Sequence, residues 1–173
     1  MKYCNFILDN WLTLVSLLLA LIGSGFALFQ WKKAVQVRRA EFVHQIIERL
    51  RFNDELVKAM YNIDYEQNWY YSGFHNSELE ASIDKLFSYL DYICYLRSNN
   101  IISKKEFAIF QYKINRVCVS ISTKEYLWNL YHFSKKNNAD CSFQFLLNYG
   151  IQYEIFPKDF RDNETLYNKT LNW

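Results

Sequence analysis

The longest apolar run in the chain extends from Asn10 to Trp31 and contains no charged residue. A helix over this run rises about 33 Å, which matches the hydrocarbon thickness of a bilayer. Trp11 and Trp31 stand at its two ends, where tryptophan rings favour the membrane–water interface. The run is longer than the apolar region of a signal peptide. We therefore expect a transmembrane helix over residues 10–31, after a short extracytoplasmic tail over residues 1–9. The alternative is a buried helix of a soluble protein.

The charged residues beside the run predict its orientation. The segment after the run contains Lys32, Lys33, Arg38 and Arg39. The segment before it carries Lys2, which Asp9 opposes. Because basic residues flank membrane helices on the cytoplasmic side, we expect the N-terminus outside and the C-terminal domain in the cytoplasm, at the inner membrane. Anionic lipid headgroups lie nearer to these basic side chains than a nucleic acid would, so we expect them to contact the lipid bilayer.

Small residues recur along one face of the predicted membrane helix. They are Ser16, Ala20, Gly23, Ser24 and Ala27. Small side chains let two membrane helices approach closely, so that packing replaces the missing hydrophobic effect. This pattern predicts a homo-oligomer that associates through the span. The alternative is that small residues are simply common in membrane helices.

The apolar pattern beyond the span keeps a helical period. Phe42, Ile46 and Leu50 lie four residues apart, and neither Gly nor Pro interrupts residues 32–52. We therefore expect the membrane helix to continue as a stalk. Asn53 is expected to cap a short helix that follows. Residues 64–76 form an aromatic loop, which either tucks into the core or contacts a partner, and we favour tucking.

Two capping boxes predict the starts of a helical hairpin, Ser77 with Glu80 and Ser103 with Glu106. The first predicted helix has an apolar stripe of Leu79, Ile83, Leu86, Phe87, Leu90, Ile93 and Cys94. The stripe of the second is Phe107, Phe110, Ile114, Val117, Cys118 and Ile121. Thr123 is expected to cap a further helix.

The C-terminal part of the chain has weaker signals. Residues 142–149 predict a short helix that ends at Gly150 as a C-terminal cap. Residues 151–156 alternate weakly before Pro157, which predicts an extended segment, and the polar residues 158–173 are expected to be loosely held.

Composition supports an all-α protein. Pro occurs once and Gly four times, which is too few for a turn-rich β sandwich. We expect a cytoplasmic helical bundle over residues 32–156, including the stalk, and a partly extended tail over residues 157–173. The 14 Tyr and 14 Phe predict an aromatic-rich core. A formal net charge of +2 predicts no polyanion partner, and we expect no nucleic acid.

Candidate chemistry is sparse. The glycine-rich nucleotide motifs, GxSxG and HExxH are all missing from the sequence, and neither the three His nor the four Cys have metal-ligand spacing. We therefore expect no metal and no cofactor. Glu80, Asp84 and Asp91 border one helical stripe and suggest paired carboxylates for acid–base work. The alternative is that they pair with Arg or Lys on neighbouring helices, and we do not expect catalysis.

Several short strings resemble a broad, uncharacterised group of bacterial single-span membrane proteins. They are RAEF (39–42), MYNIDY (60–65), DKLFSYLDYICYL (84–96), ISKKEF (102–107) and QYKINR (111–116). The resemblance implies a cytoplasmic helical domain on an inner-membrane anchor, with no established reaction. It also implies an accessory or antiviral-defence role.

Three functions remain open at this stage. The first is a non-enzymatic, self-associating membrane protein whose cytoplasmic domain binds a protein partner or a signal, such as a defence effector. The second is a membrane-tethered enzyme that uses the acidic row. The third is a ligand-sensing domain that binds a small molecule.

Overall fold

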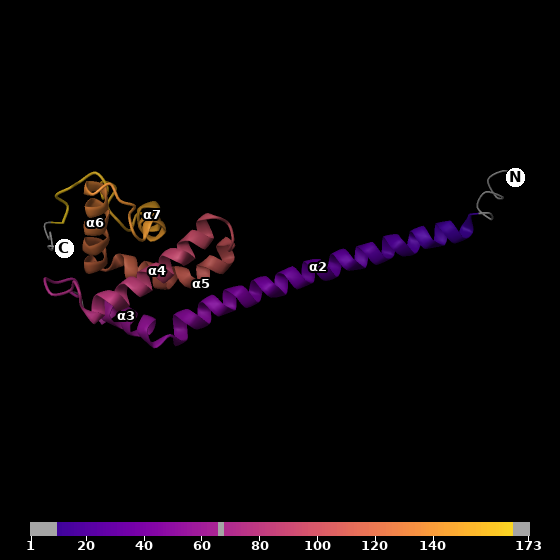
Figure 1. The fold of residues 1–173 in the computed structure, drawn as a ribbon, viewed down its shortest axis with the longest axis horizontal. Coiled ribbons are helices and arrows are strands. Elements are labelled where there is room, and N and C mark those ends of the chain that lie inside the picture. The colour runs from indigo at the N-terminus through magenta and orange to yellow at the C-terminus, as the bar shows by residue number, and fades with distance from the viewer. Residues whose placement is uncertain (1–9, 66–67, 168–173) are drawn as a thin grey trace. The chain divides into compact units, whose positions relative to one another are not determined.

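The computed structural model describes residues 10–65 and 68–167. Over these residues the regular elements are all α-helices and no strand is present, which confirms the predicted all-α class (Figure 1). The helices are α2 (Trp11–Phe52), α3 (Asp54–Tyr65), α4 (Glu78–Ser98), α5 (Lys104–Val119), α6 (Ile121–Lys136) and α7 (Gln144–Gln152). The predicted tail over residues 1–9 lies outside the described residues.

The chain divides into two compact units, residues 1–45 and 46–173. The first unit contains most of α2, whose N-terminal part is long and apolar enough to span a membrane and contains no buried residue. The helix continues without a break to Phe52, as the pattern over residues 32–52 predicts. The second unit, which we call the helical domain, begins in the last turns of α2.

Helix α4 contacts α3, α5 and α7 and supplies much of the core of the helical domain. The predicted stripe of α4 is buried from Ile83 to Cys94, and the first five residues of the α5 stripe are buried as well. Ile121 is the exception, because it is 66% exposed. The helix ends at Val119 and a new one begins at Ile121, so the period of α5 does not extend across Ser120.

Side-chain caps start the helices close to where the sequence predicts them. Asn53 Oδ1 accepts hydrogen bonds from the backbone N–H groups of Glu55 and Leu56, at 3.1 and 3.2 Å. The Ser103–Glu106 capping box is complete. Thr123 is not a cap, since Ser120 caps α6 and accepts from the Thr123 N–H. Local hydrogen bonding therefore accounts for most of the helix starts.

The aromatic loop before α4 folds into the core. Trp69, Tyr70 and Phe74 are buried, while Tyr71 is half exposed. The Trp69 ring lies 5.2 Å from Phe74 and 5.9 Å from Tyr126, centroid to centroid. The expected tucking is therefore confirmed for three of the four rings.

Three expectations for the C-terminal part are wrong. Gly150 lies inside α7 rather than after it, and the Phe156 ring packs where a Cβ would stand. Its carbonyl accepts hydrogen bonds from the N–H groups of Ile155 and Phe156, at 2.9 and 3.0 Å, so the residues after α7 form turns instead of an extended segment. Residues 158–167 are not loosely held, since Phe160 is fully buried, and the rest of the predicted tail, residues 168–173, lies outside the described residues.

Candidate functional site

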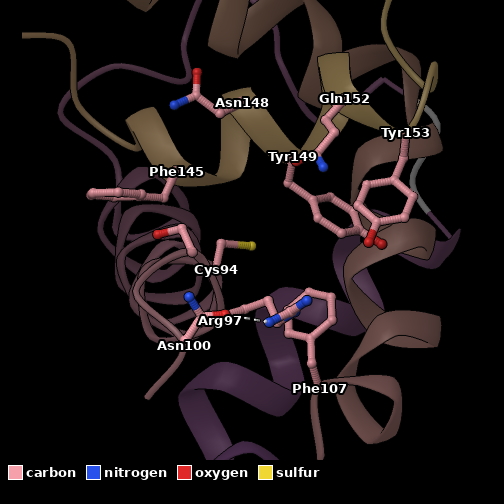
Figure 2. A pocket seen from close by; sticks show the side chains of 10 residues that line it. Cys94, Arg97, Asn100, Phe107, Phe145, Asn148, Tyr149, Gln152 and Tyr153 are labelled. Atoms are coloured by element: carbon pink, nitrogen blue, oxygen red, sulfur yellow. Dashed lines mark hydrogen bonds between the residues drawn. The ribbon is translucent and has the colours of Figure 1, made fainter. Parts of the chain in front are cut away.

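The helical domain contains a cleft of about 420 Å³ between the end of α4, the start of α5 and α7 (Figure 2). Its lining residues are Cys94, Arg97, Ser98, Asn100, Phe107, Phe145, Asn148, Tyr149, Gln152 and Tyr153. The volume lies within the range of small-molecule sites, which is roughly 300–1,000 Å³. We therefore treat this cleft as the candidate binding site.

The floor of the cleft consists of buried side chains from three helices. Cys94 of α4, Phe107 of α5 and Tyr149 of α7 are each at most 5% exposed. The Phe107 and Tyr149 ring centroids are 5.6 Å apart, and the Tyr149 hydroxyl donates to Asn115 Oδ1 at 2.6 Å. Figure 2 shows the Cys94 sulfur pointing into the cleft. Packing and this hydrogen bond hold the floor in one arrangement.

The rim is polar and more exposed than the floor. Arg97 is half-buried in the last turn of α4, and its Nη1 donates to Asn100 Oδ1 at 3.2 Å. Asn100 and Gln152 are exposed, and the Tyr153 ring stands 4.4 Å from the Tyr149 ring. An apolar floor with a few polar groups at its edge is the usual composition of a ligand pocket.

Arg97 supplies the charge of the lining itself, and Arg161 donates to the lining amide of Asn148 from outside the lining. Burial raises the pKa of the Cys94 thiol, and it also raises the pKa of the Tyr149 hydroxyl, so both groups are neutral at neutral pH. Arg97 is the one charged side chain in the lining. No ion pair joins Arg97 to an acidic residue within the part of the chain that the structure describes. The cleft therefore favours an anion.

The three acidic residues of the predicted row bind to separate groups of the helical domain. Glu80 Oε1 lies 2.7 Å from His75 Nδ1, and its other oxygen accepts from the Asn76 N–H at 2.5 Å. Asp84 Oδ1 accepts from the Tyr126 hydroxyl at 2.6 Å, and Asp91 Oδ1 accepts from the Leu146 N–H at 2.8 Å. None of the three lines the cleft.

Burial shifts the pKa of two of these carboxyl groups, and their hydrogen bonds oppose the shift. Burial raises the pKa of Asp84, and the hydrogen bond from Tyr126 opposes that effect. Burial also raises the pKa of Asp91, against the backbone hydrogen bonds at the start of α7. The Asp91 carboxylate thus joins α4 to α7 and helps to position the cleft wall. In the described residues no group of three metal-ligating side chains gathers.

The predicted membrane residues lie along α2. Trp11 and Trp31 are 55% and 63% exposed, and Lys32, Lys33, Arg38 and Arg39 are exposed too. The small-residue face (Ser16, Ala20, Gly23, Ser24 and Ala27) is exposed, and no atom lies within 4 Å of a Cβ built on Gly23. Both serine hydroxyls donate to carbonyls of their own helix at 2.9 Å, namely to Thr13 and Leu21.

Sequence reasoning did not find the cleft. The sequence pattern does not single out Arg97, and it places residue 149 only at the end of a short predicted helix. The cleft exists because α7 packs against α4, and this contact joins residues about fifty positions apart in the chain. The nearest signal in the sequence is a basic residue at the end of α4, followed by the polar stretch 98–100.

Comparison with protein-family models, with curated proteins and with solved structures finds no match for this chain.

Proposed function

We propose that the protein is a single-pass protein of the bacterial inner membrane whose helical domain binds a partner or signal in the cytoplasm without catalysing a reaction. One observation carries this proposal: no residue in the apolar part of α2 is buried. Exposed apolar surface of this length is stable in lipid and unfavourable in water. Helix α2 thus supplies an anchor, and the helical domain supplies the binding function.

The acidic residues support binding over catalysis. Acid–base catalysis needs carboxyl groups that face a substrate. Glu80, Asp84 and Asp91 are instead bonded to the domain's own histidine, hydroxyl and backbone groups. The basic residues after the apolar segment support a cytoplasmic location of the domain and contact with anionic lipid rather than nucleic acid.

A cysteine-labelling experiment tests the anchor and its orientation. We expect a membrane-impermeant maleimide to label Cys4 in intact cells and to miss a cysteine introduced by Lys105→Cys in a Cys141→Ser background. Lys105 is exposed in α5, whereas Cys94 and Cys118 are buried and would stay unlabelled on either side. Permeabilised cells, in which position 105 should label fully, provide the control. Labelling of position 105 and not of Cys4 in intact cells would reverse the proposed topology, and recovery of the chain in the soluble fraction would refute the anchor.

We further propose that α2 associates with copies of itself through the small-residue face. The Ser16 and Ser24 hydroxyls already donate within their own helix, so we assign the association to close packing at Ala20 and Gly23. A channel-like or membrane-disrupting role, such as that of a defence effector, would require this oligomer, because one helix cannot line a pore.

The double substitution Ala20→Ile and Ser24→Ile is expected to abolish the oligomer, because branched side chains hold the helix backbones apart. The variant should remain in the membrane and lose its oligomer in crosslinking of intact membranes. The matched control is the double variant Leu18→Ile with Ile22→Leu. Both residues lie on the opposite face of the helix at 100° per residue, so this variant should crosslink like the wild type. A wild-type protein that is monomeric at every lipid dilution would rule out association.

A further inference from the structure

We propose that the cleft between α4, α5 and α7 binds a planar aromatic molecule that carries a single anionic group, the chemistry of a nucleoside monophosphate. This inference rests on the proposed function, because it names the class of signal that the helical domain binds. Three features of the cleft carry it: a cation without an acidic partner, a set of aromatic side chains, and side-chain amides at the rim.

The anionic group is assigned to Arg97. Its guanidinium has five N–H donors in a fixed fork that matches phosphate or carboxylate oxygens. Asn100 accepts from Nη1 and orients the side chain, which leaves the other donors for a ligand. The groove between α3 and α5 provides a contrast, because its Arg116 already pairs with Asp64 at 2.8 Å. An arginine neutralised in this way attracts an anion less strongly than Arg97.

We assign the binding of the planar part of the ligand to the aromatic side chains of the cleft. The Tyr153 ring is 43% exposed and stands beside the floor residue Tyr149, with 32° between the two ring planes (Figure 2). Phe145 stands on the other side of the cleft, where its ring packs edge-on against Tyr95 at 5.1 Å. Aromatic faces stack on flat heterocycles of many kinds, and the exposed amide of Gln152 can hydrogen-bond to the edge of a base.

The charge count limits the ligand to one anionic group. The lining contains no Lys and no second Arg, and it contains no glycine-rich turn that would present backbone N–H groups to further phosphates. A triphosphate would therefore bring charges that the cleft does not neutralise. The volume of about 420 Å³ suits one base, one sugar and one phosphate.

The test uses the full-length protein in detergent and isothermal titration calorimetry with AMP, GMP, adenosine and ATP. We expect saturable binding of at least one monophosphate, with adenosine and ATP each weaker by about tenfold or more. If neither AMP nor GMP binds saturably at millimolar concentration, the inference is overturned. It is also overturned if ATP binds as tightly as AMP.

Two variants separate the roles of the charge and the rings. Arg97→Gln should weaken the binding of the monophosphate by about tenfold or more and leave the binding of adenosine unchanged. Tyr153→Ala should weaken the binding of both. Arg97 is half-buried and Tyr153 is 43% exposed, so both variants are expected to keep the thermal unfolding profile of the wild type. Arg116→Gln is the matched control and should bind like the wild type. Monophosphate binding that survives Arg97→Gln would refute the assigned site.

The labelling experiment keeps the two proposals distinguishable. If no probe binds while the chain is inserted with the expected topology, the ligand assignment fails and the membrane anchor stands. If the chain is soluble, the proposed function fails whatever the calorimetry shows.

Discussion

Replacing Leu90 with alanine is expected to lower the free energy of unfolding of the helical domain by about 2–5 kcal/mol. Leu90 is fully buried on α4, the helix that contacts α3, α5 and α7. Truncation removes the free energy gained by transferring the Leu90 side chain from water into the core. It also leaves a cavity that the surrounding helices fill only partly. The loss should therefore be near that of other central leucines in close-packed cores.

Urea unfolding of the full-length protein in detergent, followed by the fluorescence of the buried Trp69 and Trp128, measures this loss. Ile109→Ala on α5 is the control, because Ile109 is 51% exposed and its truncation should change the free energy of unfolding by about 0.5 kcal/mol or less. A Leu90→Ala variant that behaves like this control would show that α4 is not the centre of the core.

Replacing Phe160 with alanine is expected to cost about 3–5 kcal/mol, which is a large effect for a residue in the C-terminal segment. Phe160 is fully buried and stacks on Phe156, with 4.8 Å between the ring centroids. Phe156 in turn packs on Gly150 of α7. The carbonyl of Asn163 accepts a hydrogen bond from Trp128 Nε1 of α6 at 3.0 Å. The described residues after α7 therefore contribute to the core.

The same urea titration measures this second effect. Tyr112→Ala is the control, because Tyr112 is 71% exposed and its ring contributes little to the core. Limited proteolysis adds an independent check, since cleavage after Lys158 or Arg161 should be slow in the wild type and fast in Phe160→Ala. Equal and rapid cleavage of both proteins would support the loosely held tail that the sequence suggests.

Local patterns in the sequence were sufficient for most of the helices. An uninterrupted helical period over residues 32–52, which contain neither Gly nor Pro, predicts the continuation of α2 to Phe52. Asn53 and Ser103 cap their helices with side-chain oxygens within three residues of the groups they bind. The stripe of α4 lies on one face because its members are three or four residues apart. Each of these features depends on neighbours in the chain.

Two departures from the predicted helix boundaries are local, since Ser120 rather than Thr123 caps α6 and Gly150 lies within α7. Long-range contacts decided the C-terminal segment and the partner of Asp91. The polarity of residues 158–173 gave no sign that Phe160 is buried. Asp91 shows most clearly how the two kinds of information differ. Its position in the sequence indicates only that it borders the apolar stripe of α4, whereas the structure shows that its carboxylate accepts a hydrogen bond from the start of α7.

The cleft depends on tertiary structure in the same way. Arg97, Phe107 and Tyr149 come from three helices and have no periodic relation to one another in the sequence. Periodicity reports which face of one helix is apolar, and it carries no information about which other helix covers that face. The helix that is long and apolar enough to span a membrane, and most helix starts, therefore follow from neighbouring residues, whereas the cleft and the partners of its residues follow only from how α4, α5 and α7 pack.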